Sequence, residues 1–214
     1  MLVPFLTLCQ EQCPITTGEL LVIHRTLVAD KLTGNIEIVE LSVDPGRDSP
    51  ARLSAYSHLA GLSWTLLTTT EPQSGQAVAP SKQATISAAT EESTNASAPQ
   101  SLASTHLEEI AKYFGWLVQR IPEGSPPATD WWTGQPLTYD INHSDGFALI
   151  DAKGSERFET VAPATTGGNL SPALSNLLDA QGRANLKHPS SLSWKVDDAL
   201  NALGWLLGRP VAPG

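Results

Sequence analysis

Apolar and polar positions in the first part of the chain follow the two-residue period of β-strands. Residues 20–28 form an apolar run rich in β-branched side chains, and residues 36–43 alternate between apolar and polar positions. Asp44-Pro45-Gly46 follows the second run and is typical of a turn. The pattern therefore predicts a β-hairpin whose strands are joined by a loop of roughly five or six residues.

A helix and a third strand are predicted to follow this hairpin. Asp48-Ser49-Pro50 combines a capping side chain with a proline suited to the first turn of a helix, and Gly61 is suited to its end. Residues 62–67 then alternate again, with apolar side chains on one face. Residues 1–67 are thus predicted to form a small β-β-α-β unit.

Residues 68–103 differ in composition from the rest of the chain. They consist mainly of Ser, Thr, Ala, Gln and Pro and contain few large apolar side chains. Such a segment cannot bury enough apolar surface to offset a backbone entropy cost of about 1–2 kcal/mol per residue. We therefore expect a disordered linker between two globular units.

The remaining residues, 104–214, predict a second α+β unit in which a β-hairpin is flanked by helices. A helical stripe runs from about Thr105 to Ile121 and is ended by Pro122. Residues 132–150 alternate around the turn sequence Asn-His-Ser-Asp-Gly and predict the hairpin. Further helices are expected to begin at Ser171-Pro172 and to span residues 193–207. The predicted class is therefore α+β, with two domains.

Two segments resemble known families over short stretches. Asp130 to Leu149, with Thr133-Gly134-x-Pro136-Leu137-x-Tyr139 and then Asp145-Gly146-Phe147, resembles a hairpin near the C-terminus of type IV pilins and pseudopilins. Residues 188–209, with their Ala-Leu-Gly-Trp-Leu phrase, are similar to the passage from recognition helix to wing in winged-helix domains. The first resemblance implies a local hairpin alone, because the long apolar pilin helix is absent from this sequence. The second implies a transcription-related alternative.

Charge and motifs exclude several classes of function. The net charge is −9 and no segment is basic, which disfavours binding to nucleic acid or to acidic membranes. No apolar run reaches the roughly 18 residues of a membrane span, so a cytoplasmic location is expected. The sequence has no nucleotide-binding, nucleophile-elbow or zincin motif, so we expect no cofactor and a non-enzymatic protein.

Metal-ligating residues show no familiar spacing. Cys9 and Cys13 form a Cys-x-x-x-Cys pair without partner ligands, so reduced thiols are expected, with a local disulfide as the alternative. The histidines are scattered and are expected at the surface or half-buried: His24, His58, His106, His143 and His188. A calcium loop of the EF-hand kind is the one metal-site candidate: Asp140, Asn142, Ser144 and Asp151. Its glycine falls one position late, which favours a polar turn over a calcium site.

The residues that favour a binding function are aromatic. Trp131 and Trp132 lie in a loop rich in Pro and Gly, where exposed aromatic side chains can anchor a protein partner, although both could instead cover a core. We therefore predict an acidic, protein-binding adaptor or assembly component. The alternatives are a winged-helix-like protein and an enzyme without a local motif. We also expect Leu203 and Leu207 to share a core with Phe114 and Leu117.

Overall fold

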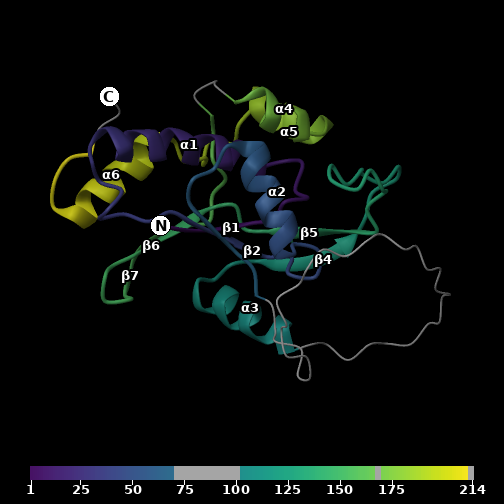
Figure 1. The fold of residues 1–214 in the computed structure, drawn as a ribbon, viewed down its shortest axis with the longest axis horizontal. Helices are drawn as coiled ribbons and strands as arrows, with labels where there is room; N and C mark the ends of the chain where they lie inside the picture. Colours follow the sequence, from purple (N-terminus) through teal and green to yellow (C-terminus); the bar gives the residue numbers. More distant parts are fainter. Residues whose placement is uncertain (70–101, 167–169, 212–214) are drawn as a thin grey trace, which may run out of the picture.

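The computed structural model describes residues 1–69, 102–166 and 170–211, and its centre is a mixed five-stranded sheet (Figure 1). The strand order is β3-β2-β1-β6-β7. Strands β1 to β3 run parallel, whereas β6 pairs antiparallel with β1, and β7 antiparallel with β6. The strands of this sheet are β1 (Leu2–Phe5), β2 (Val39–Ser42), β3 (Thr65–Leu67), β6 (Phe147–Ile150) and β7 (Glu156–Thr160). A separate two-stranded sheet contains β4 (Val118–Pro122) and β5 (Tyr139–His143).

Helices cover both faces of the five-stranded sheet. They are α1 (Cys13–Ala29), α2 (Pro50–Ala60), α3 (Leu102–Tyr113), α4 (Pro172–Leu177), α5 (Ala180–Lys187) and α6 (Val196–Leu207). Figure 1 shows α1 and α6 together on one side of the sheet and α3 on the other. Accordingly, Val3 of β1 packs in one buried cluster with Leu20 and Leu200, and Ala148 of β6 packs in another with Phe114.

Both predicted units contribute strands to this one sheet. β1, β2 and β3 come from residues 1–67, whereas β6 and β7 come from residues 104–214, and β1 pairs with β6 at Leu2 and Ala148. The structure therefore confirms a mixed α/β fold but does not confirm a division into two units. Of the predicted linker 68–103, residues 70–101 lie outside the described residues.

The first predicted strand is wrong, because residues 20–28 belong to helix α1. Leu20, Ile23 and Leu27 recur at helical spacing and are all at most 1 % exposed, so the helix buries this face against the sheet. A short apolar run fits a buried helix as well as a strand, and here tertiary packing overrides the β-propensity of the branched side chains. The second run contains β2 and was predicted correctly as a strand.

Local signals identified helix α2 correctly. The Ser49 side chain accepts a hydrogen bond from the Arg52 amide at 3.3 Å, and Pro50 occupies the first turn. Gly61 ends the helix with a φ of 71°, in the left-handed region that glycine adopts without strain. Strand β3 then lies within the predicted third strand, residues 62–67.

Two elements of the second half differ from the prediction. Helix α3 ends at Tyr113, where Gly115 turns the chain with a φ of 62°, so the expected helical stripe continues as strand β4. The predicted hairpin between β5 and β6 is also wrong. β5 pairs with β4, whereas β6 pairs with β1 and β7, so the two strands lie in different sheets. The turn residues correctly indicated that the chain changes direction here, but they do not determine which strands β5 and β6 pair with.

Helix α6 was predicted correctly and ends at Gly208, whose φ is 67°. The Asp198 side chain accepts a hydrogen bond from the Lys195 amide at 2.9 Å and so caps its first turn. The expected contact with the earlier helix is wrong, however. Leu203 packs in the cluster around α1, while Phe114 packs on the opposite face of the sheet and Leu117 is 49 % exposed.

Candidate metal centre

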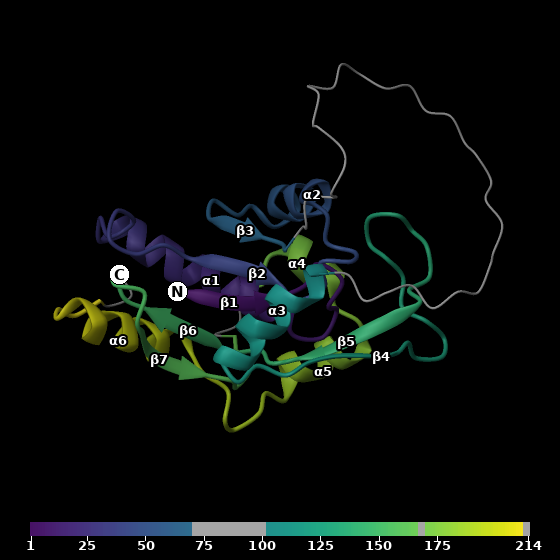
Figure 2. The same cartoon turned by 90° about the horizontal axis from the view of Figure 1, so that it is seen from below.

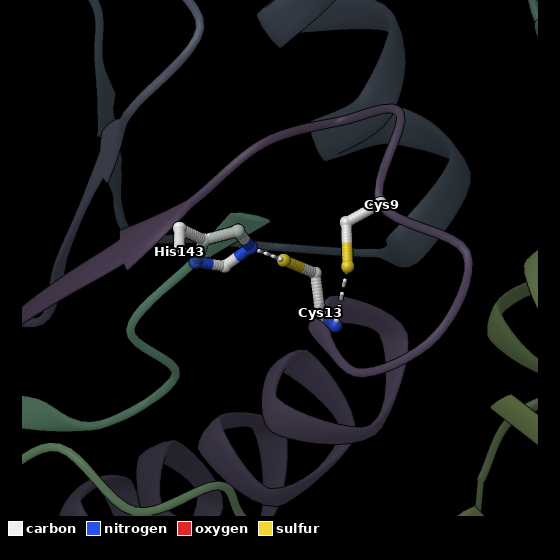
Figure 3. Close-up of side chains that lie close together, drawn as sticks. All are labelled: Cys9, Cys13 and His143. Atoms are coloured by element: carbon white, nitrogen blue, oxygen red, sulfur yellow. Dashed lines mark hydrogen bonds between the residues drawn. The ribbon is translucent and has the colours of Figure 1, made fainter. Parts of the chain in front are cut away.

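Three side chains that can bind metal meet where β1 ends and α1 begins (Figure 3). Cys9 lies in the loop after β1, Cys13 is the first residue of α1, and His143 is the last residue of β5. The two Sγ atoms and a ring nitrogen of His143 all lie within 4.8 Å of one another. Cys13 Sγ is 3.5 Å from His143 Nε2. Two sulfurs and one imidazole nitrogen therefore converge on one point.

The start of helix α1 fixes the geometry of the two cysteines. Pro14 occupies the first turn, where its missing amide proton costs nothing, and the Cys13 amide donates a hydrogen bond to Cys9 Sγ at 3.3 Å. The free amides and the dipole at a helix N-terminus favour negative charge. The fold thus places the Cys9 sulfur where a thiolate is stabilised.

The loop between the cysteines is held by residues far away in the sequence. The Gln10 carbonyl accepts a hydrogen bond from the Asp179 amide at 3.0 Å, and the Gln12 side chain donates to the Ala164 carbonyl at 2.8 Å. Gly182 of α5 packs so closely that a Cβ atom there would overlap the Gln10 carbonyl oxygen. The loop is therefore constrained by the protein itself.

His143 is oriented by its backbone neighbour. Its Nδ1 lies 2.7 Å from the Ser144 carbonyl oxygen, which can only accept, so Nδ1 carries a proton. Nε2 is therefore the nitrogen that gains or loses a proton, and it faces Cys13. The side chain is 4 % exposed, and Asp145 Oδ1 lies 3.9 Å from Nδ1. Metal-binding histidines are typically oriented in this way through their second nitrogen.

The contacts among Cys9, Cys13 and His143 shift the pKa values of all three side chains. The hydrogen bond from Cys13 and the proximity of His143 hold the pKa of Cys9 well below its usual value, although burial opposes this. Burial and the neighbouring Cys9 raise the pKa of Cys13 well above its usual value. Burial would lower the pKa of His143, but the hydrogen bond with Cys9 and its charge outweigh burial and raise it to about 9. A Cys9 thiolate beside a protonated His143 follows from these shifts.

The calcium-loop candidates are distributed over two sheets. Asp140 and Asn142 lie in β5, Ser144 follows that strand, and Asp151 follows β6. Two of these side chains accept hydrogen bonds from backbone amides. Ser144 Oγ accepts a hydrogen bond from the Leu117 amide at 2.9 Å, and Asp151 Oδ1 accepts from the Lys153 and Ser155 amides at 2.9 Å each. A calcium site at these four residues stays a prediction.

The two tryptophans differ in exposure. Trp131 is half-buried, and its Nε1 donates a hydrogen bond to the Thr7 carbonyl at 2.7 Å. Thr7 lies two residues before Cys9 in the chain. Trp132 is 44 % exposed, and the Arg52 guanidinium lies 4.9 Å from the centre of its ring. Trp131 therefore anchors the loop to the protein, while Trp132 is the side chain that a partner could contact.

No sequence motif connects His143 with the cysteines. His143 lies 130 residues from Cys13 in the chain, and no local spacing relates them. A signal was nevertheless available in the Cys13-Pro14 pair, which indicates a cysteine at a helix start. The predicted hairpin instead placed His143 in a turn, apart from the cysteines.

Comparison with known proteins links the first half of the chain to one family. The SCO1/SenC family model matches residues 1–101, a range that contains both cysteines. No curated protein matches the chain. The family match overturns the predicted function: a generic protein-binding adaptor is wrong, and so is the winged-helix alternative.

Three solved structures are similar to this chain. Bradyrhizobium japonicum ScoI with copper bound has 16 % identity and a TM-score of 0.45, over 87 % of this chain and 81 % of that one. Arabidopsis thaliana ScoI with copper bound has 14 % identity and a TM-score of 0.45, over 74 % and 71 %. A SCO1/SenC family lipoprotein from Bacillus anthracis has 22 % identity and a TM-score of 0.43, over 82 % and 76 %.

Among the described residues, no helix has the length and apolar character that crossing a membrane requires.

Proposed function

We propose that this chain is a SCO1/SenC-type protein that binds Cu(I) through Cys9, Cys13 and His143 and delivers it to a protein partner. One observation carries the proposal: two thiol sulfurs and an imidazole nitrogen lie within 4.8 Å of one another. Soft thiolates with an imidazole suit Cu(I), whereas carboxylates and carbonyls suit calcium or magnesium. The SCO1/SenC match over both cysteines supports copper as the metal.

Proton release is expected to accompany metal binding. The lowered pKa of Cys9 keeps one sulfur available as a thiolate, while the raised pKa of Cys13 keeps the other protonated in the free protein. A metal ion must displace the Cys13 proton and the proton on His143 Nε2 before both atoms can bind it. The affinity for Cu(I) should therefore rise with pH.

Anaerobic competition between the protein and a Cu(I) chelator tests this function. We expect the native chain to bind one Cu(I), and Cys9→Ser or Cys13→Ser to lose at least about a hundredfold in affinity because a thiolate is replaced by a hard hydroxyl. His143→Ala should also weaken Cu(I) binding. His188→Ala is its matched control, because His188 is exposed and lies outside the cluster. Equal affinities for the native chain and Cys9→Ser would refute the proposal.

Thiol–disulfide exchange is a second candidate function, supported by the unequal cysteines. A stabilised thiolate at Cys9 can attack a disulfide of another protein, releasing one of its sulfurs as a thiolate and forming a mixed disulfide. Cys13, deprotonated in turn, would then displace the partner's second sulfur and leave a Cys9–Cys13 disulfide. Equilibration with reduced and oxidised glutathione, followed by alkylation and mass measurement, tests whether the pair forms this bond.

A further inference from the structure

The turn between β2 and α2 contacts both chain segments that carry the metal-binding side chains. Its charged residues are Asp44, Arg47 and Asp48. Asp44 and Asp48 are 4 % and 0 % exposed, which is rare for carboxylates unless they are hydrogen-bonded. The hydrogen-bond partners of the two carboxylates therefore show which segments this turn holds.

Asp48 holds the segment that leads to Cys9. Its Oδ2 accepts hydrogen bonds from the Thr7 amide at 3.1 Å and from the Ser42 hydroxyl at 2.6 Å. Its Oδ1 accepts from the Thr7 hydroxyl at 2.5 Å. The Thr7 carbonyl is held in turn by Trp131 Nε1. Thr7, two residues before Cys9, is thus fixed through its amide, hydroxyl and carbonyl groups, and Asp48 accepts from two of them.

Arg47 and Asp44 hold the strand that leads to His143. Arg47 Nη1 donates to the Tyr139 carbonyl at 2.7 Å, and its guanidinium lies 3.7 Å from the centre of the Tyr139 ring. The Tyr139 hydroxyl donates to Asp44 Oδ1 at 2.9 Å. Asp44 also forms an ion pair with Arg47. Tyr139 is the first residue of β5 and His143 is the last.

These side-chain links matter because, in the part of the chain that the structure describes, β5 pairs with no strand of the five-stranded sheet. β5 pairs with β4 in the two-stranded sheet, whereas Cys9 and Cys13 are positioned by β1 and α1. The backbone ladder of the main sheet therefore does not set the distance between the sulfurs and His143. Figure 2 shows the two-stranded sheet lying to the side of β1 and β2.

We propose that Asp48 on the cysteine side, and the Asp44–Arg47–Tyr139 group on the histidine side, are positioning residues that fix the sulfurs relative to His143. The role in copper affinity rests on the proposed function, but the ordering of the Cys9 loop does not. Residues that orient metal ligands typically change metal affinity by about 10- to 100-fold when they are replaced.

Amide hydrogen exchange of the metal-free protein tests the cysteine side directly. We expect Asp48→Ala to speed exchange over residues 6–10 by at least about tenfold, because the Thr7 amide loses its acceptor. Asp48→Asn keeps one acceptor oxygen and should restore part of the protection. Asp151→Ala is the matched control: Asp151 also accepts two backbone amides, but in the turn after β6. Unchanged exchange in Asp48→Ala would overturn the proposal.

Copper affinity tests the consequence for the site. We expect Asp48→Ala and Tyr139→Phe to weaken Cu(I) binding by at least about tenfold, with Tyr113→Phe, at an exposed tyrosine, as the control for the second. Leu200→Ala is a control for general destabilisation. It should lower the thermal midpoint by creating a cavity in a cluster that contains none of the three ligands, and it should leave the Cu(I) affinity unchanged. If Leu200→Ala weakens binding as much as Asp48→Ala does, positioning is refuted. If the native chain binds no Cu(I), the proposed function fails, and the exchange measurement alone decides the positioning.

Discussion

Glu40 gives the most quantitative prediction, because it is a carboxyl group buried inside the sheet. It lies in β2, is 0 % exposed, and accepts hydrogen bonds from the Thr17 hydroxyl at 3.1 Å and from Trp64 Nε1 at 2.8 Å. Both donors are neutral. Burial raises the pKa of Glu40 from 4.5 to about 7, more than the two hydrogen bonds lower it.

The raised pKa sets the sign and the size of the effect on stability. Well below pH 4.5, Glu40 is protonated in both the folded and the unfolded protein, so its raised pKa does not change the free energy of unfolding. As the pH rises to about 7, the unfolded state ionises first and the folded state loses stability relative to it. The rise in the pKa of Glu40 from 4.5 to about 7 corresponds to a loss of about 3 kcal/mol in folding stability, reached above pH 7.

Replacing Glu40 by Gln removes this titration while keeping an oxygen acceptor and the side-chain volume. We expect Glu40→Gln to match the native protein near pH 4.5 and to be more stable by up to about 3 kcal/mol at pH 8. Urea unfolding followed by tryptophan fluorescence between pH 4.5 and 8.5 measures the difference. Glu37→Gln is the control, since Glu37 is exposed in the same part of the chain. A stability difference that does not change with pH would refute the reasoning.

Two substitutions test the contacts that hold the site's surroundings. Arg52 forms a bidentate pair with Asp130 at 2.8 and 2.7 Å. Arg52→Ala still leaves the Asp130 carboxylate with hydrogen bonds from the Trp132 and Thr133 amides, so we expect a loss of about 1.5–3 kcal/mol in urea unfolding. A loss below about 1 kcal/mol would contradict this. Gly182→Ala drives a methyl group into the Gln10 carbonyl and should lower both stability and Cu(I) affinity. Gly34→Ala, which has nothing within 4 Å of the added atom, should change neither, and equal effects would contradict the close packing.

Local chemistry determined which elements the sequence could predict. Helix α2 was predicted correctly because Ser49 and Gly61 define its ends through contacts within the helix itself. Helix α1 was not, because its apolar residues face a sheet that is completed by strands far along the chain. The same reason explains the failed hairpin, since β6 finds its partners in β1 and β7 rather than in the neighbouring β5.

The candidate site could be predicted only in part. The Cys-x-x-x-Cys-Pro segment is visible in the sequence, but the third candidate ligand, His143, lies in β5, 130 residues from Cys13. Only the tertiary structure places that strand beside the start of α1. The burial of Asp44 and Asp48 could not be predicted for the same reason, because Asp44-Pro45-Gly46 indicates a turn but not which distant residues pack on it.

X-ray absorption at the copper edge of the Cu(I)-loaded protein tests the central claim most directly. The account predicts two sulfur ligands and one nitrogen ligand in the native chain, loss of the nitrogen in His143→Ala, and no change in His188→Ala. A copper ion surrounded by sulfur alone in the native chain, or a nitrogen that persists in His143→Ala, would contradict a metal centre built from Cys9, Cys13 and His143.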